Sequence, residues 1–301
     1  MAISRAQLLK ELLPGLNALF GLEYKKYPEE WRQIFDVETS NRSFEEDVKL
    51  SGFGLAPVKG EGNTIEYDEA NEVWSVRYNH EVVALGFSLT EEAIEDNLYD
   101  SLSKRYTKAL ARSMQETKEI KGANILNNGF TSFTTGDGKA LFAEDHPLVS
   151  GGTLANEPST AVDLNETALE DAIITISQWT DERGLLIAAQ AQKLVIPPQL
   201  QFVAHRIMKS DLRVATADND TNAMKDMGMI SGGMTVNHYL TDPDAWFLKT
   251  DVPDGAKHFT RRKMKTGMEG DFDSGNVRYK AHERYSFGVT DYLAFYGSPG
   301  A

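Results

Sequence analysis

The segment from Thr90 to Gly122 predicts one long helix, and no other feature restricts the fold of this chain as strongly. Its residues hold a single stripe at helical spacing: Ile94, Leu98, Leu102, Tyr106, Leu110, Met114 and Thr117. Thr90 is suited to cap the helix and Gly122 to end it. A helix of about 30 residues spans about 45 Å at 1.5 Å per residue. Because only one side is apolar, we expect the helix to act as a beam on which other elements pack.

A two-stranded ribbon precedes this helix, between residues 65 and 90. Trp74, Val76 and Tyr78 alternate with polar neighbours, which is the period of a strand with two different faces. A turn at Asp68 to Glu72 would make the ribbon a hairpin. An isolated hairpin is marginally stable in water, so the ribbon needs another surface to lie on.

The rest of the chain predicts a mixed α+β body. Ser4 and Gln7 fit a capping box for a first helix, which Pro14 should kink or split. Residues 1–55 as a whole are expected to be extended and loosely folded on their own. Beyond the loop at 146–160, helical and strand patterns alternate, and the last 60 residues return to strand patterning.

Composition excludes several classes of protein. The chain has no cysteine, which removes disulfides, thiol nucleophiles and thiolate metal sites. Its 31 basic and 45 acidic residues give a net charge of -14, which opposes general affinity for nucleic acid. No stretch approaches the roughly 18 uncharged apolar residues of a membrane helix, and the N-terminus does not read as a secretory signal. We therefore expect synthesis in the cytosol.

The motif search yields no catalytic, cofactor or metal site. The six histidines lack zinc-site spacing, and a solitary histidine is more often structural than catalytic. Residues 135–140 resemble a phosphate loop superficially and predict a hairpin turn instead. Asp218, Asp220 and Asn222 copy three calcium-ligand positions, but the glycine and the bidentate glutamate that should follow are absent.

Three further motifs leave alternatives open. Residues 271–276 could chelate a cation or form a hairpin tip, and we favour the tip. The basic run at 261–265 could contact phosphate or an acidic neighbour, or be a solvated strand edge. Asp145 and His146 form an acid pair with no evident nucleophile, so a hydrolase site there is the weakest alternative.

Several phrases of the sequence resemble the major capsid proteins of tailed bacteriophages, which have the Hong Kong 97-like fold. They are GDGKALFAEDHPLVSGGT (136–153), DERGLLIAAQAQKLVIPPQLQFVAHRIMKS (181–210), NHYLTDPDAWFLK (237–249) and DFDSGNVRYKAHERYSFGVTDYLAFYGSPG (271–300). They are similar to the group of major head subunits that includes Mu-like phages. The resemblance covers most of the chain beyond residue 85, and the first 60 residues match only by position.

The resemblance implies a division of the chain and two contact regions. The parts would be an N-terminal arm at 1–50, an E-loop hairpin at 52–89, a peripheral domain at 90–160 and 262–301 with its spine helix at 90–121, and an axial domain at 161–261. The E-loop would lie on a neighbouring subunit through Glu66, Asp68, Glu69, Glu72, Trp74, Val76 and Tyr78. Contacts between capsomers would use the hairpin tip of Asp271, Phe272, Asp273, Ser274, Gly275 and Asn276.

By the same resemblance the protein is not an enzyme and needs no cofactor. Its partners would be copies of itself in hexamers and pentamers, a separate scaffolding protein, a portal and a possible decoration protein. The shell would enclose double-stranded DNA without sequence-specific binding, in a virion assembled in the host cytoplasm. An encapsulin, a cellular nanocompartment of the same fold, remains the alternative.

Overall fold

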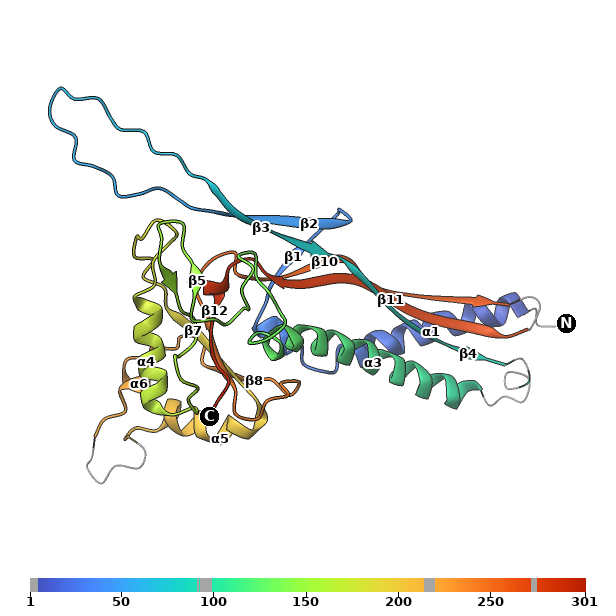
Figure 1. Ribbon diagram of the computed structural model, residues 1–301. Coiled ribbons are helices and arrows are strands. Elements are labelled where there is room, and N and C mark those ends of the chain that lie inside the picture. Colours follow the sequence, from blue (N-terminus) through green and yellow to red (C-terminus); the bar gives the residue numbers. More distant parts are fainter. Residues whose placement is uncertain (1–4, 91, 93–98, 214–219, 272–274) are drawn as a thin grey trace.

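The chain folds into an elongated molecule with a compact body at one end and a long arm at the other (Figure 1). In the computed structural model, two helices and long strands build the arm, and a ribbon ending in a wide loop projects past the body. The structure describes residues 5–90, 92, 99–213, 220–271 and 275–301.

The predicted beam helix is confirmed as α3, Tyr99–Asn127, although its end was placed too early. Gly122 lies inside the helix, where a Cβ atom would come within 3.1 Å of the Cβ atom of Trp31 and 3.4 Å of the Phe287 ring. Glycine therefore serves a close approach at this position and does not end the helix. The predicted start at Thr90 borders residues 91 and 93–98, which lie outside the described residues.

The first helix, α1 (Arg5–Tyr24), runs through Pro14 without a break, so the expected split is wrong. Leu16 and Phe20 of α1 are buried in one cluster with Leu110 and Met114 of α3. This packing compensates for the hydrogen bond that a proline cannot donate. Ser4 of the proposed capping box lies outside the described residues.

A four-stranded sheet lies against these helices in the order β1-β10-β11-β4. Strands β10 and β11 pair antiparallel from Ala256 opposite Val289 out to Gly270 opposite Val277. Along β11, alternate side chains such as Tyr279 and Ala281 are buried in the cluster with α1 and α3. The bounds are β1 Asp36–Thr39, β4 Glu81–Leu89, β10 Ala256–Gly270 and β11 Val277–Val289.

The ribbon is built differently from its prediction. Strand β3 (Glu72–Asn79) pairs antiparallel with β2 (Phe44–Leu50), while β4 joins the sheet beside β11. The proposed turn at Asp68 to Glu72 is therefore wrong, and residues 51–71 form a long loop between the strands. Part of the segment expected to be loosely folded supplies the missing strand. The turn residues therefore did not determine which strands pair. Strands β2 and β3 pair across a loop that is longer than most hairpin connections.

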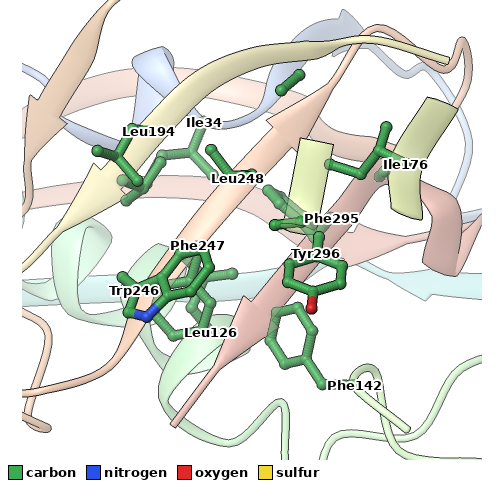
Figure 2. Packing of buried hydrophobic residues seen from close by; sticks show 14 of the residues in the cluster. Ile34, Leu126, Phe142, Ile176, Leu194, Trp246, Phe247, Leu248, Phe295 and Tyr296 are labelled. Carbon is green, nitrogen blue, oxygen red and sulfur yellow. The ribbon is translucent and has the colours of Figure 1, made fainter. Parts of the chain in front are cut away.

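The body contains a second four-stranded sheet, in the order β12-β9-β7-β8, and the largest hydrophobic cluster. Figure 2 shows Leu194, Trp246, Leu248 and Phe295 of this sheet among the packed side chains. The strands are β7 Ala191–Ile196, β8 Met234–Val236, β9 Trp246–Thr250 and β12 Phe295–Ser298. The helices are α4 Glu166–Ser177, α5 Gln201–Lys209 and α6 Ala223–Asp226.

The remaining elements are short. They are β5 His146–Pro147, β6 Thr153–Leu154 and the 3-10 turns η1 Trp31–Gln33, η2 Pro198–Leu200 and η3 Tyr292–Ala294. The Glu119 carboxylate of α3 accepts the backbone N–H groups of Glu30 and Trp31, at 3.1 and 3.0 Å. This contact fixes η1 to the long helix.

Replacing Ala111 by proline tests the role of α3. Ala111 is fully buried within the helix, and a proline there removes a backbone hydrogen bond and clashes with the preceding turn. We expect Ala111→Pro to lower the free energy of unfolding by roughly 3 kcal/mol or more. The matched variant Ala111→Gly should cost only about 1 kcal/mol. Equal urea midpoints for the two variants, followed by circular dichroism, would contradict an uninterrupted helix.

His258 predicts a loss of stability in acid. Burial, with a further contribution from Lys118 and Arg32, lowers the pKa of this histidine from 6.5 to about 3. Between these values the unfolded chain binds a proton that the folded chain does not, so stability falls as the pH falls from about 6.5 towards 3. In urea titrations at several pH values, His258→Phe should show a shallower decline than wild type. An unchanged slope would contradict a neutral buried His258.

Candidate functional site

Tyr78 fastens the ribbon to the sheet of its own chain. Its side chain is 2% exposed, and its hydroxyl lies 2.5 Å from Oγ1 of Thr290. The ring meets Phe259 edge-on with centroids 4.9 Å apart, and a Cβ atom on Gly288 would come within 2.5 Å of it. Burial is the main reason that the pKa of the Tyr78 hydroxyl is raised. The expectation that a neighbouring subunit covers Tyr78 is therefore corrected.

Trp74 also packs on its own chain. Its indole Nε1–H donates to the carbonyl oxygen of Thr290 at 3.0 Å, and its ring centroid lies 6.0 Å from that of Tyr292. A side chain on Gly136 would collide with the indole, at 2.0 Å from Cδ1. Val76 is half-buried. The strand period was right, but the contacts of Trp74 are with its own subunit.

Charged pairs also hold the base of the ribbon, which is the part where β2 and β3 pair. Nζ of Lys257, which is largely buried, lies 2.7 Å from Asp47, 2.9 Å from Asp254 and 3.4 Å from Glu38. Burial alone would lower the pKa of Lys257, but its bonds to Asp47 and Asp254 raise it overall. A partly buried pair of Lys49 and Asp291 adds a second link between β2 and the body. The base of the ribbon is thus held in place by its own chain.

Beyond this base, the loop at 51–71 projects away from the molecule (Figure 1). Its large apolar side chains are exposed: Phe53 by 60%, Leu55 by 85%, Val58 by 100%, Ile65 by 57% and Tyr67 by 88%. Scattered apolar residues on a surface need no explanation, but a cluster on one projecting loop marks an interaction site. Sequence reasoning missed these apolar residues because it placed the apolar part of the contact in the strand and only acidic residues in what proved to be the loop.

The four acidic residues predicted for the ribbon also lie in or beside this loop, and all are exposed. Asp68 accepts the Gly54 backbone N–H at 2.7 Å and two contacts from Arg183 at 3.0 Å. The Gly54 bond is the leading cause that lowers the Asp68 pKa. Glu66, Glu69 and Glu72 form no ion pair within the described part of the chain. Asp68 therefore ties the loop to the body, and the other three carboxylates are available.

The turn between β10 and β11 lies at the far end of the arm, as the hairpin interpretation requires. The backbone N–H of Asp271 donates to Asn276 at 2.8 Å, and Gly275 adopts a φ of 71° that favours glycine. Arg278 pairs with the Asp271 carboxylate at 2.7 Å. Phe272, Asp273 and Ser274 lie outside the described residues.

The geometry around Asp145 and His146 does not form a catalytic pair. His146 is fully buried and stacks on Tyr292, with ring centroids 3.8 Å apart. Its Nδ1 lies 2.6 Å from Asp137 and its Nε2 lies 3.2 Å from Asn156, while Asp145 pairs with Lys139 on the surface. Both imidazole nitrogens are occupied by structural contacts, and sequence reasoning missed the Asp137 partner.

The remaining motifs have structural roles. Thr134 and Ala140 form a β-bridge around the turn that resembled a phosphate loop. Asn222 caps α6 by accepting the backbone N–H of Lys225, whereas Asp218 lies outside the described residues. Within the described ranges, no three His, Asp or Glu side chains are grouped to hold a metal ion, and no helix has the length and apolarity to cross a membrane.

A sequence model described as phage capsid protein matches residues 75–298 of this chain, which is well over half of its length. The chain belongs to this phage capsid protein family. The match covers β4, α3, both four-stranded sheets except β1, and the hairpin at the end of the arm. No curated protein shows significant similarity to the sequence as a whole.

The fold of this capsid protein is similar to that of several solved structures. The virus-like particle from Pyrococcus furiosus is 12% identical and aligns over 96% of this chain and 99% of its own, with a TM-score of 0.53. The capsid of an empty GTA particle is 14% identical over 89% of this chain and 88% of its own, with a TM-score of 0.54. The capsid of Myoviridae phage XM1 is 11% identical over 90% of both chains, with a TM-score of 0.50. These likenesses confirm the α+β Hong Kong 97-like fold.

The predicted identity as a major capsid protein of tailed-phage type is thereby confirmed. The family and the fold point to a structural role and a place in the virion capsid. In such a protein the relevant site is a surface that meets other copies. The projecting loop is the candidate, because its large apolar side chains are exposed in the subunit.

Truncation of Tyr78 should now destabilise the capsid subunit itself. Tyr78→Ala removes a buried ring and should lower the free energy of unfolding by roughly 3–5 kcal/mol, as other buried aromatic truncations do. Tyr78→Phe removes only the hydroxyl contact with Thr290 and should cost about 0.5–1.5 kcal/mol. Tyr67→Ala in the exposed loop should stay within about 0.5 kcal/mol of wild type in the same urea titration. Equal costs for Tyr67→Ala and Tyr78→Ala would contradict the anchoring role.

Proposed function

We propose that this major capsid protein assembles into hexamers and pentamers of an icosahedral shell that encloses packaged double-stranded DNA. The observation that carries the proposal is the loop at 51–71, which exposes five large apolar side chains on a base held by the subunit's own sheet. Such a loop increases contact area between subunits without enlarging the core of any one of them. Closure of a symmetric shell multiplies many such contacts.

The proposed contact uses the loop and Glu72 at the start of β3, and not the apolar side chains of that strand. The rigid base limits the conformational entropy that is lost when the loop docks, because β2 and β3 are already fixed. The exposed side chains of Phe53, Leu55, Val58, Ile65 and Tyr67 would be covered by a neighbouring subunit of the same capsomer. Glu66, Glu69 and Glu72 would pair there with basic groups.

We propose that the subunit is divided into the following parts. The N-terminal arm covers residues 1–50, of which 44–50 also supply a ribbon strand. We assign the E-loop to 44–79, because 81–89 belong to the sheet. The peripheral domain covers 90–160 and 262–301, and the axial domain covers 161–261. We propose that the tip at 271–276 contacts an adjacent capsomer, since it ends the longest projection of the arm.

Further partners are part of the proposal. A separate scaffolding protein, a portal and a decoration protein would act with the shell, which would form in the host cytoplasm. The net charge of -14 suits a shell that holds DNA without adhering to it. Particles purified from the natural host decide between this proposal and an encapsulin. Packaged DNA supports a phage head, whereas enclosed protein cargo without DNA would favour the nanocompartment.

Removing the exposed apolar side chains tests the contact directly. The triple variant Leu55→Ser, Val58→Ser and Tyr67→Ser should give at least tenfold fewer closed particles by negative-stain microscopy, because these groups are apolar cover for a neighbour. Its melting temperature as a free subunit should match that of the wild type. The control replaces exposed Val149, Leu186 and Met227 by serine elsewhere on the surface. Normal particle yield from the loop variant, or equal loss from the control, would contradict the assignment.

A further inference from the structure

The four-stranded sheet of the arm has two outer edges, which differ in their side chains. Strand β10 forms one of them beyond Thr260, where its pairing with β1 ends. That stretch carries the cations Arg262, Lys263 and Lys265, and its pairing with β11 is interrupted by two register shifts. Charges and bulges on an edge strand oppose pairing with another chain. The basic run at 261–265 therefore protects this edge.

Strand β4 forms the other edge and lacks this protection. It contains no proline, and Glu81 at its inner end is its single charged residue. Glu81 pairs with Lys121 of the same chain. The register with β11 is unbroken from Glu81 to Leu89, and no strand of the described chain pairs with the other side of β4. A long and almost uncharged edge of this kind is a site where a further strand can add.

Apolar side chains beside this edge are largely exposed. Leu85 lies on the same face of β4 as Val83 and Phe87, which pack towards α1 and α3, yet it is 47% exposed. On α3, Tyr106 is 48% exposed, and its ring centroid lies 5.6 Å from that of Phe87. Val82 on the opposite face of β4 is 64% exposed. A strand added at this edge would therefore bury apolar side chains on both faces of the sheet.

A second copy of β4 is the strand that fits this edge. Of the remaining edge strands in the described chain, β1, β2 and β3 carry charges, β5, β6 and β8 have three residues or fewer, and β12 is buried. Two copies of one strand can pair antiparallel about a two-fold axis, where each presents the same surface. With Leu85 opposite its own copy, all nine residues of the strands overlap. Glu81 then faces Leu89, so no like charges are opposed.

We propose that the β4 strands of two copies of this chain pair antiparallel about a two-fold axis and join their arm sheets into one. The inference rests on the proposed function, because it adds a second contact between copies of the shell protein. Backbone hydrogen bonds supply the affinity of such strand addition, and the side chains beside it supply the specificity. The contact differs from that of the loop at 51–71, since it uses a strand edge and the adjoining side of α3.

Cross-linking tests the pairing directly, because the chain has no cysteine of its own. Residues opposite each other in an antiparallel pair are close enough for a disulfide. In particles oxidised under mild conditions, Leu85→Cys should give at least tenfold more covalent dimer on a non-reducing gel than the control Lys265→Cys. Both positions are exposed, and the control lies on the protected edge of the same sheet.

Two further cysteine variants define the direction of the pairing. The proposed register places Val82 opposite Ser88, and both residues are exposed. Particles that contain copies of Val82→Cys together with copies of Ser88→Cys should therefore form covalent dimers. Particles of either variant alone should form at least tenfold fewer, because about 20 Å of extended strand separates the two identical cysteines.

A charge exchange at the axis tests whether the contact supports assembly. Leu85→Lys alone and Leu85→Glu alone each place like charges opposite one another, and each should reduce the particle yield at least tenfold. Co-expression of the two variants should restore the yield to within about threefold of wild type, because opposite charges then meet. The free subunits should keep the wild-type melting temperature. The control Leu186→Lys changes another exposed leucine away from the edge and should assemble normally.

The outcomes separate the two claims. Normal particle yield from Leu85→Lys, or Leu85→Cys particles without a covalent dimer, overturns the inference and leaves the proposed function in place. Photo-crosslinking from position 85 to a different protein, in particles from the natural host, would assign the edge to that protein and overturn the inference. Failure of the wild type to form particles under all conditions counts against the proposed function. The Leu85→Cys dimer is then read on concentrated free subunits, where its absence overturns the inference as well.

Discussion

The antiparallel pairing of β10 and β11 is the interaction on which the rest of the structure depends. One face of this pair covers the buried stripe of α3 through Tyr279 and Ala281. At the inner end of the pair, Tyr78 of the ribbon packs on Gly288 and contacts Thr290. The outer half of the pair forms the arm, and the helices of the subunit pack on only one of its two faces. A strand alternates between two faces, so one pair can serve a core and an interface together.

Buried charge accompanies this arrangement. Lys118 of α3 lies 2.8 Å from Glu283 of β11, and both side chains are almost fully buried. Lys257 is surrounded by three carboxylates at the base of the ribbon. Such pairs contribute little net stability because both ions lose hydration, but removal of one partner is strongly destabilising. We infer that they fix the position of α3 and of the ribbon on the sheet. A loop with a fixed base can then meet a neighbour in one orientation.

Features that depend on residues close in the sequence were predicted correctly, whereas features that depend on residues far apart in the sequence were not. The long helix, the late strand pair and the turn at 271–276 could be predicted because periodicity and turn chemistry are local. The predicted helix split at Pro14 and helix end at Gly122 were wrong. Packing of α1 on α3, and of α3 on Trp31, outweighed local propensity. The partner of β3 was missed because β2 lies more than 20 residues away, beyond a loop without strand signals. Tyr78 was expected to be covered by a neighbouring subunit, but its own chain buries it.

The sequence by itself determined the α+β class, the beam helix, the projecting ribbon, the absence of thiol chemistry and, through its resemblance, the capsid family. Only the tertiary structure decided which part of the ribbon is free. Alternation along a strand shows that two faces differ, but it does not show which surface each face meets. That depends on β11 and the residue after it bringing Gly288 and Thr290 beneath Tyr78, whereas the large apolar side chains of the loop at 51–71 stay exposed.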